Sequence, residues 1–209
     1  MYKRISLFIM ALMFLMSAGV FAAETDTDAQ TPVSSVEETE EDVALRLRKE
    51  DVIFLHIDNY ATVSDGVLKW IDRGNQAVKP FIKEGRTMVP LRFITEELGA
   101  TVVYDGATRG ITITLGDTVM SLTVGQKAYT LNGQMFQMDS EALVMENRTF
   151  VPVRFVSEAL GRAVQWLGDE RIVVVTPADA LWDSENPVEK AALAEVQLSL
   201  SPLGRNKVQ

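Results

Sequence analysis

The chain has 209 residues, of which 47% are hydrophobic and 23% are charged, a composition typical of a globular protein. Its formal charge of −9 makes nucleic acid and anionic membrane surfaces unfavourable partners, because both would repel an acidic surface. Cysteine is absent, which excludes disulfides, thiolate catalysis and cysteine-ligated metal sites. We expect one domain with tails.

Residues 1–22 have the organisation of a secretory signal peptide. Lys3 and Arg4 form a short basic start, an apolar run follows, and small residues end at Ala22. We expect Sec-type export, cleavage after Ala22, and a secreted or envelope-associated product with no remaining membrane span. The alternative is an uncleaved anchor, for which this apolar run is borderline in length.

Residues 23–51 are polar and acidic. From Glu24 to Asp51 the sequence has ten acidic and three basic side chains. Such a segment buries too little apolar surface to offset the entropy of ordering, so we expect a disordered linker that spaces the following domain from a surface.

An internal repeat organises the rest of the chain. Residues 84–99 read EGRTMVPLRFITEELG, and residues 146–161 read ENRTFVPVRFVSEALG, each position 62 residues after its counterpart. A match of this length without gaps indicates one structural unit used twice. We place the repeats at about residues 67–115 and 129–177.

Each repeat is expected to contain one short helix. Pro90 and Pro152 suit the first helical position, and Gly99 and Gly161 suit the left-handed residue that ends a helix. Apolar residues between them recur at spacings of three and four. Helices this short need a sheet to pack on.

Alternating apolar residues predict the strands of that sheet, and the short turns between them favour antiparallel pairing. We therefore predict an α+β domain over residues 52–177, an antiparallel β-sheet wrapped on two short helices and built from a duplicated β-β-α-β-β unit. Residues 178–209 are predicted as a tail, in which Asn186 and Pro187 favour a helix over 187–198. The strands are expected at 53–57, 67–71, 101–104, 111–115, 119–123, 128–131, 163–166 and 172–176.

The doubled pattern Arg-Thr-x-Val-Pro-x-Arg-Phe, followed by Glu, Leu-Gly and an aromatic residue, resembles the copper amine oxidase N-terminal-like domain, also called the stalk domain. The resemblance covers roughly residues 52–177. It implies an exported, wall-associated appendage of Gram-positive bacteria with no defined ligand or reaction. A copper site with three histidines is excluded within this chain, which has a single histidine, His56.

We interpret the repeated polar residues, prolines and glycines as structural fasteners, because a duplicated scaffold repeats its fasteners whereas a single active site needs only one copy. Arg92–Glu96 and Arg154–Glu158 have the spacing of helix-surface ion pairs, and the arginines before them suit bonds to turn carbonyls. Ligand binding by these arginines is the alternative. The set is Arg86, Pro90, Arg92, Glu96, Gly99, Arg148, Pro152, Arg154, Glu158 and Gly161.

Four aromatic residues raise the question of sugar or peptide stacking. Tyr104 and Trp166 occupy equivalent repeat positions. We assign both to core packing, because an aromatic side chain buries a large apolar area and so stabilises the fold strongly. Trp70 and Trp182 lie nearer the expected edges and are the better ligand-stacking residues if a glycan is bound.

No catalytic residue, metal site or cofactor is predicted. His56 is interpreted as a structural histidine, and no phosphate loop, nucleophile elbow or zinc motif occurs. The sequence predicts a non-enzymatic interaction or spacer module of the cell envelope that binds wall polysaccharide or a partner protein. One alternative is an architectural dimerisation module, favoured by unpaired sheet edges. Another is an enzyme with an acid-base pair among Asp105, Asp139 and Asp169, which lie in turn-prone sequence.

Overall fold

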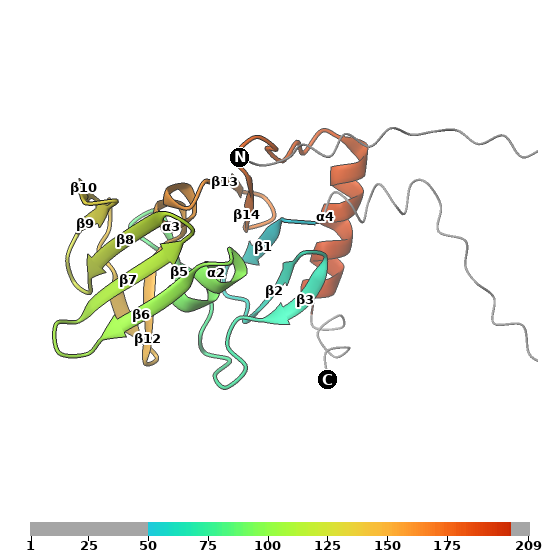
Figure 1. Cartoon of the computed structure of the whole chain (residues 1–209). Coiled ribbons are helices and arrows are strands. Elements are labelled where there is room, and N and C mark those ends of the chain that lie inside the picture. Colours follow the sequence, from blue (N-terminus) through green and yellow to red (C-terminus); the bar gives the residue numbers. More distant parts are fainter. Residues whose placement is uncertain (1–49, 202–209) are drawn as a thin grey trace, which may run out of the picture. The chain divides into compact units, whose positions relative to one another are not determined.

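The structure is a computed structural model that describes residues 50–201. The predicted signal peptide, almost all of the predicted linker and residues 202–209 lie outside this described part. Within it the protein consists mostly of antiparallel strands with three helices, which confirms the α+β class (Figure 1). The elements are β1 (Ile53–His56), β2 (Ala61–Ser64), β3 (Val67–Trp70), β4 (Phe81–Lys83), β5 (Arg86–Pro90), α2 (Leu91–Glu97), β6 (Thr101–Asp105), β7 (Gly110–Leu115), β8 (Thr118–Thr123), β9 (Ala128–Leu131), β10 (Gln134–Gln137), β11 (Leu143–Met145), β12 (Arg148–Pro152), α3 (Val153–Ala159), β13 (Arg162–Leu167), β14 (Ile172–Pro177) and α4 (Pro187–Leu200).

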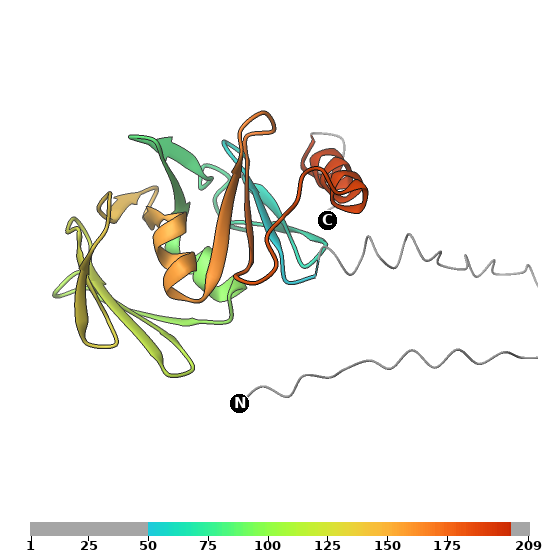
Figure 2. The ribbon, with the colours of Figure 1, turned by 90° about the horizontal axis from the view of Figure 1, so that it is seen from above.

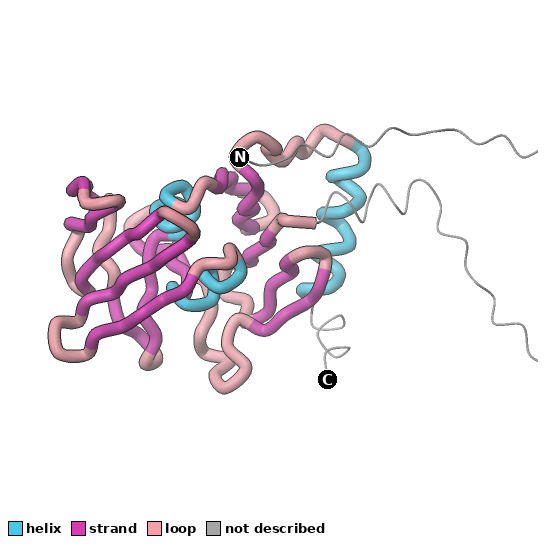
Figure 3. Tube along the Cα trace, viewed as in Figure 1, coloured by secondary structure: helices cyan, strands magenta, loops and turns pink. Residues whose placement is uncertain are grey.

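These strands form three sheets, whereas the sequence left open whether the two repeats share one sheet. In the order of hydrogen-bonded neighbours, sheet A is β13-β14-β1-β2-β3, sheet B is β11-β12-β5-β4 and sheet C is β10-β9-β8-β7-β6. The hairpin after α2 joins sheet C, whereas the hairpin after α3 joins sheet A. Figures 2 and 3 show α2 and α3 between sheets A and C, with α4 on the far side of sheet A.

Strands β5 and β12 pair at the centre of sheet B and lead directly into α2 and α3. Val89 pairs with Val151, its counterpart in the other repeat. The pairing is symmetric about this pair, because Met88 lies opposite Pro152 and Pro90 lies opposite Phe150. Each central strand then pairs outward with the strand before it, β4 or β11. The two copies of the repeated motif therefore lie side by side in one sheet.

The helices begin one residue later than predicted. Pro90 and Pro152 are their N-caps, with φ of −61° and −59° and extended ψ of 121° and 124°. Proline fixes only φ, and that value suits the end of a strand as well as the start of a helix, so the sequence did not settle the boundary. Gly99 and Gly161 end the helices as predicted, with left-handed φ of 76° and 77°.

Two tight turns, one before each repeated helix, are the tips of hairpins whose flanking strands were not predicted from the sequence. Glu84 and Gly85 have φ of 51° and 72°, and Glu146 and Asn147 have φ of 52° and 56°. Positive φ at both central residues is the type I′ geometry that joins two antiparallel strands. Strands β4, β5, β11 and β12 result, and β2 and β10 were also missed.

Two hydrophobic clusters cover the two faces of sheet A. The larger contains side chains of all three sheets and of α2 and α3, including Leu55 and Ile94. The smaller joins Phe54 and Val174 of sheet A to Val196 of α4. Phe54 is fully buried in this smaller cluster.

The segment after Pro177 was predicted as a tail, but its helix is part of the fold. The Asn186 side chain accepts hydrogen bonds from the backbone N–H groups of Val188 and Glu189, so α4 starts where predicted, and it ends at Leu200. Its buried side chains pack on sheet A. Among residues 50–201, no helix has the length and apolar character needed to cross a membrane.

Candidate functional site

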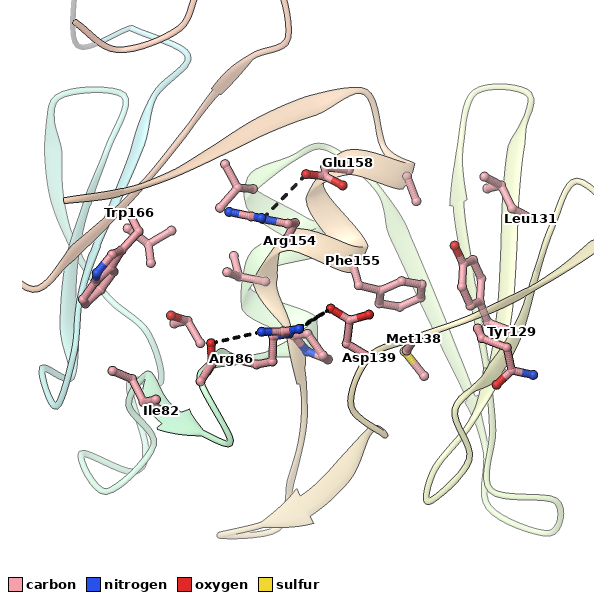
Figure 4. Close-up of a pocket in the computed structure, with 18 residues that line it drawn as sticks. Ile82, Arg86, Tyr129, Leu131, Met138, Asp139, Arg154, Phe155, Glu158 and Trp166 are labelled. Carbon is pink, nitrogen blue, oxygen red and sulfur yellow. Dashed lines mark hydrogen bonds and ion pairs between the residues drawn. The ribbon is translucent and has the colours of Figure 1, made fainter. Parts of the chain in front are cut away.

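A cavity of about 690 Å³ lies between the β4–β5 hairpin, the start of α3, strand β9 and strand β13. Its size is within the range of small-ligand sites. Ile82 and Arg86 reach it from the first half of the chain, and Arg154 and Trp166 reach it from the second (Figure 4). The site therefore exists only because sheet B brings the two halves together.

Two arginines give the cavity its polar character, and each has a carboxylate beside it. Arg86 binds Asp139 at 2.8 Å and also donates to the carbonyl of Gly85. The Nε atom of Arg154 lies 3.7 Å from a carboxylate oxygen of Glu158. All four side chains are between 48% and 68% exposed. Such exposed pairs contribute at most about 1 kcal/mol and can exchange partners with a ligand.

Aromatic side chains supply the apolar part of the cavity. Tyr129 packs edge-on against Phe155, with ring centroids 4.4 Å apart. Burial, and then the negative charge of Glu158, raises the pKa of Tyr129, so its hydroxyl stays a neutral donor at physiological pH. Trp166 stands across the cavity from these rings (Figure 4).

Trp166 corrects the prediction of core packing, because its side chain is 43% exposed. Tyr104, the equivalent residue 62 positions earlier, is 50% exposed. Each ring lies over a glycine two residues further on: a Cβ at Gly168 would be 3.4 Å from Trp166, and one at Gly106 would be 3.8 Å from Tyr104. Both rings are thus held on hairpin turns at the surface.

The matching arginine of the other half lies in different surroundings. Arg148, the counterpart of Arg86, binds Asp72 at 2.6 Å and donates to the carbonyl of Asn147. Asp72 is only 13% exposed. Burial alone would raise the pKa of Asp72, but the hydrogen bonds from Arg148 and from the Gly74 backbone, with the arginine's charge, outweigh it and lower the pKa.

The remaining predicted fasteners occupy ordinary structural positions. Pro90 and Pro152 are buried at the ends of β5 and β12, and Pro152 also lines the cavity. Among the described ion pairs, Arg154 and Glu158 form one, whereas the equivalent Arg92 and Glu96, both exposed, form none. Equivalent residues of the two repeats therefore make different contacts.

The two tryptophans predicted to stack on a ligand are not in the cavity. Trp182 is 3% exposed and packs edge-on against Phe54 at 4.9 Å, so the prediction that it meets a glycan is wrong. The reason is that α4 and the loop before it cover sheet A. Trp70 is half-buried and packs against Tyr60 at 5.1 Å.

The acids considered for an enzyme lie apart from one another in the chain's turns. Asp105 caps its own turn through Thr108 and Ala107, and the hydrogen bond from Thr108 lowers the pKa of this exposed carboxyl. Asp139 faces Arg86, and Asp169 lies in the β13–β14 hairpin. His56 is half-buried, with Nδ1 2.6 Å from the carbonyl oxygen of Ile57. Within residues 50–201, no three His, Cys, Asp or Glu side chains cluster as a metal site.

The cavity combines charged, hydrogen-bonding and aromatic groups. The described residues that line it include no histidine, cysteine, serine or lysine, and its two carboxylates each face an arginine. Guanidinium groups offer donors, the carboxylates offer acceptors, and the exposed indole offers an apolar face. Such a combination suits a ligand with several hydroxyl or other polar groups around an apolar face.

Fold and cavity together define an α+β module with a cavity between its two repeats. The chain belongs to the copper amine oxidase N-terminal domain family, whose model matches residues 71–175. That family is a non-catalytic stalk domain, as the resemblance in the sequence implied. The chain is also similar to a protein named "Protease inhibitor" from Brevibacillus choshinensis, 29% identical over 108 residues. The match covers 52% of this chain and 30% of that protein, so it spans less than a third of the relative's length.

Sequence reasoning missed the aromatic members of the site, and one signal could have found them. Trp166 is followed at two positions by Gly168, and Tyr104 by Gly106, so each aromatic ends a strand next to a turn. Residues at the ends of hairpin strands are more exposed than those in the middle. Tyr129 and Ile82 carried no such signal, because their exposure to the cavity depends on how three sheets meet.

Proposed function

We propose that this protein is a non-catalytic interaction module of the cell envelope that binds polysaccharide in the cavity beside Trp166. The observation that carries the proposal is an indole, 43% exposed, on the wall of a cavity that also holds two arginine–carboxylate pairs. Aromatic faces stack on the apolar faces of sugar rings, and paired donors and acceptors match their hydroxyl groups.

Three further features support this proposal. The family is a non-catalytic one, the first 22 residues have the pattern of an export signal, and the following acidic segment suits a spacer. A module exported in this way meets the polysaccharides of the cell surface. Because no membrane span is expected after cleavage, retention at the wall depends on binding to one of its components.

We also infer that the two halves are copies of one β-β-α-β-β unit. Helices α2 and α3 have the same length, and their bounds are offset by the same 62 residues as the sequence motif. The pairing of β5 with β12 is also symmetric, because the central pair joins the equivalent residues Val89 and Val151. In this scheme the paired units form the scaffold, and the cavity is where the scaffold's symmetry is broken.

The test measures retention of the mature protein on purified bacterial cell walls and on their polysaccharide fraction at physiological salt. Trp166→Ala removes the stacking face, and Tyr104→Ala is the matched control because it removes an equally exposed aromatic at the equivalent position outside the cavity. We expect Trp166→Ala to weaken binding at least ~10-fold, which is about 1.4 kcal/mol, and Tyr104→Ala to change it less than ~2-fold.

Two results would overturn the proposal. The first is wild-type protein that is not retained on walls or on wall polysaccharide. The second is retention that Trp166→Ala and Tyr104→Ala reduce equally, since binding would then involve some surface other than the cavity. Circular dichroism of both variants verifies the fold, and because both side chains are exposed we expect unfolding midpoints close to that of the wild type.

A further inference from the structure

Strand β10 is an unprotected sheet edge. Its four residues, Gln134–Gln137, are all exposed, and none is charged. Among the described edge strands, β3, β4, β6 and β13 each contain a charged residue, and β11 is followed at once by Glu146. Charged side chains on an edge discourage pairing with another chain. Strand β10 lacks that protection and has Met135 74% exposed.

The register of the β9–β10 hairpin shows which backbone groups point outward. Asn132 and Gly133 have φ of 50° and 81°, a type I′ turn, so the flanking residues Leu131 and Gln134 form a hydrogen-bonded pair. Hydrogen-bonded and non-hydrogen-bonded pairs then alternate along the hairpin. Phe136 therefore bonds inward to β9, whereas Met135 and Gln137 direct their N–H and C=O groups away from the sheet.

The far end of the hairpin agrees with this alternation. The backbone N–H of Met138 donates to the carbonyl of Lys127 at 2.8 Å, so position 138 also bonds inward. Four outward groups, two donors and two acceptors, are thus left along β10.

We propose that two copies of the chain pair through β10, antiparallel, about a two-fold axis at Phe136. In this register Met135 of one copy faces Gln137 of the other and exchanges two hydrogen bonds with it, and the symmetric pair adds two more. All four outward groups are used. Sheet C of one copy continues into sheet C of the other.

The aromatic side chains fit the same axis. Phe136 is 41% exposed and stacks on Tyr129, with ring centroids 5.4 Å apart. At the axis the two Phe136 residues face each other in a non-hydrogen-bonded pair, where side chains approach most closely. A row of four aromatic rings then crosses the interface and removes both phenylalanines from water.

Charge points to a second copy as the occupant. Two-fold pairing places the same strand on both sides of the axis, so a charged residue on that strand would bring two like charges into one interface. With a net charge of −9, two copies repel each other in general, and β10 offers an edge strand on which they meet without a local charge. Four residues from each copy bury little area, so the dimer is weak, with a Kd above about 10 μM.

Sedimentation equilibrium of the mature protein from about 10 μM to about 1 mM tests the proposal. We expect a monomer–dimer equilibrium that Met135→Pro abolishes, because proline removes an outward N–H without breaking a bond to β9. Val144→Pro is the matched control. It makes the same change on β11, where Val144 is 54% exposed and, by the same type I′ register, also points its N–H outward.

A single cysteine tests the register, since the wild-type chain has none. Under mild oxidation Phe136→Cys is expected to form a disulfide-linked dimer, because position 136 faces itself, whereas Val144→Cys is expected to remain a monomer. The dimer proposal fails if the wild type is monomeric at every concentration, or if Met135→Pro and Val144→Pro weaken association equally. Cross-linking at 144 rather than at 136 would also overturn it.

Discussion

The two halves of sheet B use the same arginine in contrasting ways. Arg86 binds Asp139 across an open cavity, and Asp139 is 68% exposed. Arg148 binds Asp72, which is 13% exposed and also accepts a hydrogen bond from the backbone of Gly74. A repeated residue is therefore no guarantee of a repeated role. One copy closes a structural contact, while the other leaves a guanidinium available to a ligand.

The phenylalanine that follows each helix arginine shows the same difference. Phe93 of α2 is 8% exposed and belongs to the main core, whereas Phe155 of α3 is half-buried and packs against Tyr129 at the cavity. The surroundings of Phe93 are therefore closed to solvent, whereas those of Phe155 border the cavity. We expect the same difference in how much each half contributes to stability.

The largest effect is expected from truncating these phenylalanines. Phe93→Ala leaves a cavity in the main core and should cost about 3–4 kcal/mol of unfolding free energy, whereas Phe155→Ala should cost about half as much because its ring is already partly solvated. Urea denaturation of the two variants measures both values. Equal losses would mean that the two halves are packed alike, contrary to the exposures.

The sequence predicted the scaffold far better than the site. Helix ends at Gly99 and Gly161 followed from local chemistry, because a left-handed residue is marked by glycine. The strands after each helix followed from alternation. The division into three sheets did not, because it depends on whether a hairpin joins sheet A or sheet C, and both choices bury similar apolar residues.

The errors at Trp166 and Trp182 have one cause. Position 166 was predicted to be buried and position 182 exposed, and the structure has the reverse, with 43% and 3% exposed. Exposure of a large aromatic is set by what packs on it from elsewhere in the chain. Trp182 packs in one cluster with helix α4, whereas none of the described elements covers the cavity-facing part of Trp166. The local sequence contains neither fact.

A smaller difference is expected from the arginines themselves. Arg148→Gln breaks a charged hydrogen bond to a mostly buried carboxyl and should lower the unfolding free energy by about 1–2 kcal/mol, whereas Arg86→Gln should lower it by less than about 1 kcal/mol. Thermal unfolding at neutral pH compares the two. If Arg86→Gln proved the more destabilising, the exposed pair would have to be regarded as structural.

The carboxyl partners extend this contrast to pH. The pKa of Asp72 is lowered from its ordinary value of 3.8, so its ionisation stabilises the fold fully above about pH 4, and that contribution is lost as the pH falls through the lowered pKa. Asp72→Asn should therefore be less stable than wild type at pH 7, with a difference that shrinks in acid. Asp139→Asn is the control at pH 7, where loss of its exposed ion pair with Arg86 should cost at most about 1 kcal/mol in urea unfolding. A pH-independent deficit for Asp72→Asn would contradict this assignment.

The smallest expected effect comes from the turns that precede the two arginines. Gly85 and Asn147 occupy equivalent positions with φ of 72° and 56°, a region that glycine and asparagine tolerate and most residues do not. A Cβ at Gly85 would meet no atom within 4 Å, so any cost of substitution is that of the backbone alone. Gly85→Ala should cost about 1 kcal/mol and Gly85→Asn only a few tenths, because asparagine already serves at the same place in the other half. Urea unfolding of both variants decides the matter: if alanine and asparagine were equally harmful, the turns of the two halves would differ in more than their sequence.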